Sequence, residues 1–356
     1  MQAALEYKPN FPEAVERMKR FWDLEEPGDR VPAAIYLPEP EGRKADGSFY
    51  GRLGDYVAHM EEYFRLRADV PDEYFPTVVP QYGHTMISVL LGCEVRHAAE
   101  TLWSIPCMTG EVPEADLSLD WGNEWGARFR EDYERLLETA RGRYAVGQYE
   151  IEGVSDTYSA VRSAERMFYD FADEPEKAHR FTSRIVDALV SFGRWNQRNV
   201  SDRQDLMGGM TSVYPIWMPR DSCVTTEDHS VMFSREYYSE TIRRHAERLT
   251  SSFACTLMEV HGEGNHQIRS FAGMAGVGLL TLGNPLGMGA EHRADVQSLL
   301  GRKRLRFGVE ENKIEEVLEF TGIRGVLLCF AADSVASANR ILGRLEKATQ
   351  RLKRST

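Results

Sequence analysis

A short apolar run near residue 255 ends in side chains that can hold a metal ion or move protons. The run Cys255–Val260 is followed by His261, Glu263 and His266, with glycines between them. Side chains of a β-strand repeat every two residues, so a strand that ends in His-x-Glu would carry His261 and Glu263 on one face. If that face opens at the mouth of a barrel, the pair could bind a metal or transfer protons.

Eight short β-rich runs alternate with amphipathic helical stretches along the chain. This alternation is typical of a (β/α)8 barrel, and 356 residues are enough for one with added segments. We therefore predict an α/β fold, a single (β/α)8 TIM barrel domain over residues 1–356, with an N-terminal extension and an insertion near residues 96–125. The predicted strands are Ala33–Leu37, Tyr74–Val79, Ala145–Ile151, Met207–Val213, Thr256–His261, Val277–Leu282, Leu305–Val309 and Val326–Phe330.

Residues that follow barrel strands line the mouth where active sites form. Asp221 follows the fourth predicted strand and is our candidate for a catalytic residue that handles substrate or protons. Two of the other candidates are tyrosines, which could flank a flat ligand or simply pack beneath loops. The predicted substrate-binding residues are Gln81, Tyr82, Tyr214, Glu150, Asn284 and Glu310.

Composition narrows the class of protein. The 43 basic and 55 acidic residues give a net charge of −12, which argues against a nucleic-acid partner. No run approaches the roughly 18 apolar residues of a membrane span, and residues 1–10 lack the pattern of a signal peptide. Five cysteines without framework spacing predict reduced thiols in a reducing compartment. We expect a cytoplasmic enzyme with a small-molecule substrate, and a homodimer is compatible with this composition.

Several segments, in order, are similar to one superfamily. Gly28–Pro32 resembles its first-strand segment, and Val79–Gly83 with Leu91–Val95 resembles its "fG…lG.ev" segment. Phe171–Glu176 resembles its usual helix start, and Met232–Tyr237 its "isPe.f" segment. Together these segments cover most of the chain and resemble the uroporphyrinogen decarboxylase-like superfamily, which contains the decarboxylase and zinc-dependent methyltransferases that act on corrinoids and coenzyme thiols.

The site motifs are nearer the methyltransferase branch. That branch carries H-x-C-G-N and a cysteine in a late strand, and here the two motifs begin at His261 and Cys329. The resemblance implies that His261, Glu263 and Cys329 bind zinc, with Glu263 in place of the family's middle cysteine. Glu263 is also a candidate catalytic acid or base. A zinc ion would lower the pKa of a bound substrate thiol and make it a nucleophile.

The resemblance thus implies a zinc-dependent methyltransferase. It would move a methyl group between a methylated corrinoid or small donor and a thiol or folate acceptor, with a corrinoid carrier protein as partner. Two alternatives stay open, because a fold does not determine a reaction. One is a metal-free decarboxylase or lyase in which carboxylates and His261 handle protons. The other is a barrel that binds a tetrapyrrole or corrinoid without catalysis.

Overall fold

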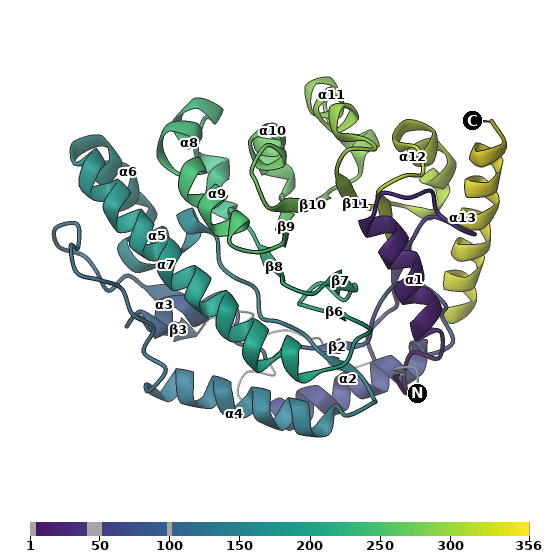
Figure 1. The fold of residues 1–356 in the computed structure, drawn as a ribbon, viewed down its shortest axis with the longest axis horizontal. Coiled ribbons are helices and arrows are strands. Elements are labelled where there is room, and N and C mark those ends of the chain that lie inside the picture. Colours follow the sequence, from purple (N-terminus) through teal and green to yellow (C-terminus); the bar gives the residue numbers. More distant parts are fainter. Residues whose placement is uncertain (1–4, 41–51, 98–101, 356) are drawn as a thin grey trace.

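The computed structural model describes residues 5–40, 52–97 and 102–355 of the chain. At its centre is a curled sheet of six parallel strands, in the order β1-β12-β11-β10-β9-β8, and helices lie around the outside of it (Figure 1). The strands are β1 (Ala33–Tyr36), β8 (Ser222–Thr225), β9 (Cys255–Glu259), β10 (Val277–Leu282), β11 (Arg304–Gly308) and β12 (Val326–Ala331).

A second parallel pair extends this series. It consists of β2 (Thr77–Val78) and β5 (Ala145–Val146), and a single bridge from Ile151 to Thr225 joins the segment after β5 to β8. The predicted strands Tyr74–Val79 and Ala145–Ile151 are therefore in place but much shorter than expected. Five other predicted strands coincide with β1 and β9–β12 to within two residues.

One predicted strand is wrong. Within Met207–Val213 only β6 (Gly209–Met210) is extended, and it pairs antiparallel with β7 (Met218–Pro219). The left-handed backbone at Met207 (φ 55°) and Gly208 (φ 83°) turns the chain just before β6. The place beside β9 is taken by β8, a four-residue strand directly after the turn at Asp221 and too short to stand out in the sequence.

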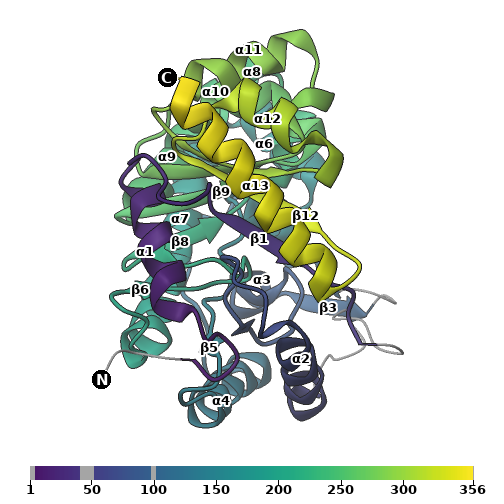
Figure 2. The same cartoon turned by 90° about the vertical axis from the view of Figure 1, so that its right-hand side faces the viewer.

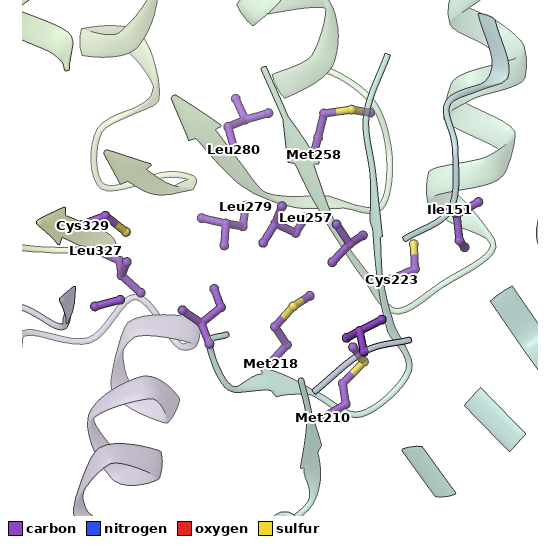
Figure 3. Packing of buried hydrophobic residues seen from close by; sticks show 14 of the residues in the cluster. Ile151, Met210, Met218, Cys223, Leu257, Met258, Leu279, Leu280, Leu327 and Cys329 are labelled. Carbon is purple, nitrogen blue, oxygen red and sulfur yellow. The ribbon is translucent and has the colours of Figure 1, made fainter. Parts of the chain in front are cut away.

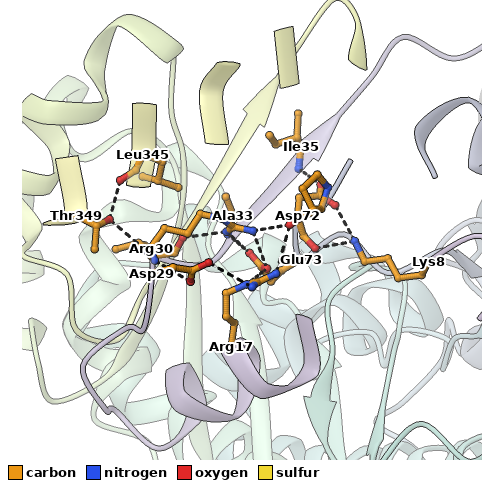
Figure 4. Close-up of polar contacts among 12 residues, drawn as sticks. Lys8, Arg17, Asp29, Arg30, Ala33, Ile35, Asp72, Glu73, Leu345 and Thr349 are labelled. Carbon is orange, nitrogen blue, oxygen red and sulfur yellow. Dashed lines mark hydrogen bonds and ion pairs between the residues drawn. The ribbon is translucent and has the colours of Figure 1, made fainter. Parts of the chain in front are cut away.

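The described residues do not show the predicted closed eight-stranded barrel, because side chains take the place of a regular ladder between β1 and β2. A backbone bond from Glu73 N to Ala33 O (2.7 Å) joins β1 to the segment before β2. Amides of β1 donate to carboxylates: Ala33 N to Glu73 Oε2 (2.7 Å) and Ile35 N to Asp72 Oδ2 (2.8 Å). Within the described ranges no backbone pairing joins β1 to β2. Lys8, Arg17, Arg30 and Arg67 surround the two carboxylates (Figure 4). We call Lys8, Arg17, Arg30, Arg67, Asp72 and Glu73 the seam network.

Amphipathic helices cover the strands. In α7, Phe181, Ile185 and Leu189 recur at the helical period and are fully buried. The helices are α1 (Phe11–Trp22), α2 (Leu53–Arg67), α3 (Met86–Leu90), α4 (Glu124–Thr139), α5 (Val154–Arg162), α6 (Ala164–Asp173), α7 (Pro175–Asn199), α8 (Arg235–Thr241), α9 (Arg243–Ser251), α10 (Ile268–Ala272), α11 (Ala290–Leu299), α12 (Ile314–Thr321) and α13 (Val335–Ser355). No helix of the described residues is long and apolar enough to cross a membrane.

The two added segments lie where they were expected. The N-terminal extension forms α1, which leads into β1 (Figure 2), and its Trp22 indole donates to Trp217 O (3.0 Å). The insertion begins with the antiparallel pair β3 (Glu94–His97) and β4 (Leu102–Ile105). A disulfide joins Cys93 to Cys107 at the base of this pair, so the prediction of reduced thiols is wrong for these two cysteines.

The interior of the curled sheet is apolar below its carboxyl end. Leu257 of β9, Leu279 of β10 and Leu327 of β12 point into it, with Met210 and Met218 beneath (Figure 3). Alternation then places the residues two positions later on the same inner face, nearer the carboxyl end. Polar side chains there lie above an apolar layer.

Candidate active site

A row of three polar side chains crosses the inner face of the sheet. Glu259 of β9 lies opposite Thr281 of β10, and Thr281 lies opposite Arg306 of β11. Each comes two residues after the inward-facing layer that includes Leu257 and Leu279, so alternation directs all three inward. We call Glu259, Thr281 and Arg306 the polar row. A carboxylate, a hydroxyl and a guanidinium thus stand side by side at the carboxyl end of the strands.

His261 joins the acidic end of this row. Its Nε2 lies 3.1 Å from Asp228 Oδ1 and 3.9 Å from Glu259 Oε2. The Tyr214 hydroxyl donates to Glu259, and the Thr226 hydroxyl donates to Asp228. The imidazole is half exposed, so it can exchange protons with a bound molecule while Asp228 holds its orientation.

Glu150 is a buried acid on the same side. Its Oε2 lies 3.5 Å from His84 Nδ1, and its Oε1 has no hydrogen-bond partner in the described residues. Burial and the nearby carboxylates of Glu259 and Asp228 raise the pKa of Glu150 well above its usual range. Burial therefore favours the protonated form of Glu150 unless a cation is bound beside it, and the protonated form can donate a proton.

Two further carboxylates fix the loop that carries Asp228. Asp156 accepts from His229 N (2.8 Å) and from His229 Nδ1 (2.7 Å), while Glu227 accepts from Val154 N (2.8 Å). A Cβ on Gly153 would lie 2.2 Å from Thr226 O, so only glycine allows this approach between the segments after β5 and β8. These contacts make Asp228 a rigid partner for His261.

Arg306 forms the basic end of the polar row. Its Nη2 donates to the Tyr36 hydroxyl (3.0 Å), and its guanidinium lies 5.1 Å from the centre of the Tyr214 ring. Burial raises the pKa of the Cys329 thiol, whereas the charge of Arg306 lowers it. Burial also raises the pKa of Tyr36 to about 12. The thiol and the phenol are therefore neutral neighbours of a buried cation.

The structure does not assemble the zinc ligands expected from the resemblance. Strand β9 ends at Glu259 and a 3-10 turn, η4 (Gly262–Gln267), begins at once, so His261 and Glu263 do not alternate on one strand face. Cys329 lies on β12, separated from β9 by β10 and β11. Among the described residues, no three His, Cys, Asp or Glu side chains are grouped so that they could hold a metal ion. The three side chains as placed do not fit a zinc ion.

Asp221 lies at the wrong end of the sheet for catalysis. It precedes β8 instead of following a strand, and it pairs with Arg194 and accepts from Ala254 N (3.2 Å). Its backbone has φ of 62°, as a tight turn requires. The misplacement follows from the missed strand. Asp221 was expected after the fourth predicted strand, whereas it lies directly before β8.

The predicted substrate-binding residues divide into two groups. Tyr214 and Glu150 reach the polar row and its acidic end, as described above. Tyr82 is buried and donates to Asp132 (2.6 Å), and Asn284 caps a turn by accepting from Leu286 N (3.0 Å). Gln81 donates to Val79 O (3.1 Å) and is half buried, while Glu310 is exposed after β11. These four were found by position after a strand, which does not fix where a side chain points.

Sequence reasoning missed five residues that form the site. Glu259 could have been found, because Leu257, Glu259 and His261 alternate and so share one strand face. Thr281, Arg306 and Tyr36 lie within or at the end of strands, whereas candidates were sought only after the strands. Asp228 follows β8, which was not predicted at all.

Comparisons with known proteins address the fold. No protein-family model matches the sequence, and no curated protein matches it. The structure is similar to that of a methyltransferase from Methanosarcina mazei, with a TM-score of 0.62 and 14% identity over 98% of this chain and 99% of that one. A B12-independent methionine synthase from Shewanella sp. W3-18-1 aligns over 90% of this chain and 95% of that one, with a TM-score of 0.44 and 9% identity, too distant for inference. At this identity the first likeness establishes a shared fold alone.

Proposed function

We propose that the chain is an enzyme that transfers a methyl group to a small acceptor bound at the carboxyl end of the strands. The observation that carries the proposal is the convergence of His261, Asp228 and Glu259 on one open face. The scaffold that positions them has the fold of a methyltransferase over nearly its whole length. Because folds host many reactions, the site and the scaffold support the proposal only together.

The side chains can manage the protons of such a transfer. An acceptor thiol or amine must lose its proton as it attacks the methyl carbon, and His261 can take that proton while Asp228 stabilises the imidazolium. The bond from the methyl carbon to the donor atom breaks as the new bond forms, and the donor keeps the electron pair. Glu150, whose protonated form is favoured by burial, can supply a proton to a leaving atom that needs one.

We further propose, from the sequence resemblance, that the enzyme uses zinc and a corrinoid carrier protein. Bound zinc would supply a Lewis acid for an acceptor thiol. Because His261, Glu263 and Cys329 do not fit the ion as placed, the proton steps above use only side chains. Metal analysis of the purified protein decides the matter: about one zinc per chain, lost in His261→Ala, would restore the zinc assignment.

A labelled-methyl assay tests the reaction. Methylcobalamin and small methyl donors carrying a 13C methyl group would be offered with a thiol or tetrahydrofolate, and products followed by NMR. We expect His261→Ala and Glu259→Gln to lower turnover by about 100-fold, as removal of an acid–base group does. Glu310→Gln, an exposed carboxylate after β11, is the matched control and should keep full activity. Turnover unchanged in His261→Ala would overturn the assigned role.

A carboxy-lyase is the second candidate, and Glu150 favours it. A buried acid whose pKa is raised is suited to protonate the carbanion left when carbon dioxide departs. Release of carbon dioxide from a carboxylated substrate, lost in Glu150→Ala and without label transfer in the methyl assay, would select this reaction over the first.

A further inference from the structure

Three buried polar atoms at the carboxyl end of the strands have no partners among the described residues. They are Glu150 Oε1, Thr281 Oγ1 and Arg306 Nε, and none has a hydrogen bond from the described part of the chain. Their residues are only 6%, 7% and 9% exposed. Native proteins rarely leave buried donors and acceptors unpaired, so these atoms mark places where a bound molecule completes the bonding.

Two of these atoms are neighbours, and the third lies across from them. Thr281 and Arg306 are opposite each other in the β10–β11 ladder, and Thr281 is opposite Glu259 in the β9–β10 ladder. Adjacent strands lie about 4.8 Å apart, so the backbones of Glu259 and Arg306 are separated by roughly 10 Å. Tyr214 spans the interval, since its hydroxyl reaches Glu259 and its ring lies under Arg306. This spacing suits a small molecule.

The basic end has the chemistry of a carboxylate site. Arg306 makes no ion pair with any carboxylate of residues 5–40, 52–97 and 102–355. Its side-chain partners there are two neutral groups, the Tyr36 hydroxyl and the Cys329 thiol. A guanidinium recognises a carboxylate through two parallel N–H donors, and the unpaired Nε–H of Arg306 is one of them. The Thr281 hydroxyl beside it can add a third donor.

The acidic end of the polar row has the chemistry of a cation site. Glu150, Glu259 and Asp228 gather there, and the only basic side chains that contact them in the described residues are His84 and His261. No lysine or arginine of the described ranges pairs with any of the three carboxylates. An ammonium N–H would satisfy Glu150 Oε1. Any onium charge would offset the charge of Glu259 and Asp228 and favour the ionised form of Glu150.

We propose that the polar row and Glu150 bind a small zwitterion, with its carboxylate on Arg306 and Thr281 and its onium group facing Glu150 and Glu259. That this ligand is the substrate rests on the proposed function. It would then present a methyl group on a cationic atom beside His261, where the acceptor is deprotonated.

Calorimetric binding with matched probes tests the charges separately. Glycine betaine and γ-butyrobetaine are zwitterions that differ in the distance between the carboxylate and the ammonium group. Their neutral isosteres, 3,3-dimethylbutanoate and 5,5-dimethylhexanoate, lack the cation, and tetramethylammonium lacks the carboxylate. We expect at least one betaine to bind about tenfold or more tightly than its isostere and than tetramethylammonium. If neither betaine exceeds its isostere, the zwitterion proposal is wrong.

Variants assign each charge to its residue. Arg306→Gln should remove the preference for the betaine over tetramethylammonium, and Glu150→Gln should reduce its preference over the isostere. Cys329→Ser tests whether the thiol is instead the counter-ion of Arg306; it should leave betaine affinity within twofold, as should Glu310→Gln. Circular dichroism checks that each variant is folded. Arg306→Lys keeps the charge but loses the planar guanidinium, so its affinity for the betaine should lie between those of the wild type and Arg306→Gln. Binding unchanged in Arg306→Gln would overturn the assignment. These binding measurements do not depend on catalysis. If the zwitterion binds but no methyl transfer is detected, the proposed function is wrong and the binding proposal stands.

Discussion

The seam network and the polar row are both clusters of buried charge, but they are completed differently. At the seam, Asp72 accepts from Lys8 Nζ (3.0 Å), Arg67 Nη2 (2.7 Å) and Ile35 N (2.8 Å). Glu73 is matched in the same way by Arg30 and Ala33 N. At the mouth, Glu150, Thr281 and Arg306 each keep a buried atom that no described residue satisfies. The chain itself completes the bonding of one cluster, whereas we propose that a ligand completes the other.

The two clusters also shift carboxyl pKa values in opposite directions. Burial alone would raise the pKa of Asp72, but the charges of Arg67 and Lys8 outweigh it and lower that pKa. Burial raises the pKa of Glu150, and neighbouring carboxylates add to the effect. A buried carboxyl group therefore stabilises the fold where cations surround it, and becomes a proton donor or a cation site where they do not.

The largest effect should come from breaking the seam. Asp72→Asn leaves Lys8 and Arg67 buried without an anion, so we expect the free energy of unfolding in urea to fall by roughly 3–5 kcal/mol. Asp29→Asn is the control, because Asp29 is half exposed and lies 3.5 Å from Arg17. It also accepts from Arg30 N (2.9 Å), a bond that an asparagine oxygen can keep, so the change in stability should be no more than about 0.5 kcal/mol. Equal effects of the two substitutions would contradict the structural role of the seam.

A pH series should show the opposite slopes of the two regions. Burial and Asp156 raise the pKa of Glu152, beside the mouth, to about 8 from 4.5. The folded state therefore holds a proton that the unfolded state releases between these values, and stability falls as pH rises through that window. Glu152→Gln stays neutral and should become the more stable protein by roughly 3 kcal/mol above pH 8.

Asp72 supplies the internal comparison for that series. Its folded-state pKa is lowered, so the stability it contributes is present above the unfolded pKa of 3.8 and is lost as pH falls. The deficit of Asp72→Asn should thus shrink toward acid pH, while the advantage of Glu152→Gln should grow toward alkaline pH. Parallel pH profiles for the two variants would mean that the regions do not differ as described.

The sequence predicts the scaffold better than the site, and the two regions show why. Long apolar strands such as Val277–Leu282 and Val326–Phe330 were found because burial on both faces leaves a continuous hydrophobic signal. The four-residue strand β8 gives no such signal and was not predicted. As a result Asp221 was placed after a strand instead of before one, and Asp228, which follows β8, was not recognised as a site residue. The seam and the polar row depend on which distant charges meet, as Asp72 meets Lys8 across 64 residues, and a single sequence does not contain that information.

Removing the charge of the polar row should separate stability from binding. Arg306→Met keeps the length of a side chain that lies against Tyr214 but removes an incompletely paired buried cation. We expect stability to rise or to fall by no more than about 1 kcal/mol, because apolar replacements of buried charges are often neutral or stabilising. Affinity for carboxylate probes should nevertheless be lost. A destabilisation as large as that of Asp72→Asn would place Arg306 with the structural charges of the seam.

The smallest effect should come from the hydroxyl that links the two ends of the polar row. Tyr214→Phe removes the donor to Glu259 but keeps the ring beneath Arg306. The Glu259 side chain is 26% exposed, so water can replace the lost bond, and the expected loss of stability is about 1 kcal/mol. A double-mutant cycle with Glu259→Gln measures the coupling, which should reach roughly 0.5–1 kcal/mol. Tyr237→Phe, on the surface helix α8, should show none with Glu259→Gln. Simple additivity of Tyr214→Phe and Glu259→Gln would mean that Tyr214 only packs against Arg306 and does not hold the acidic end of the row in place.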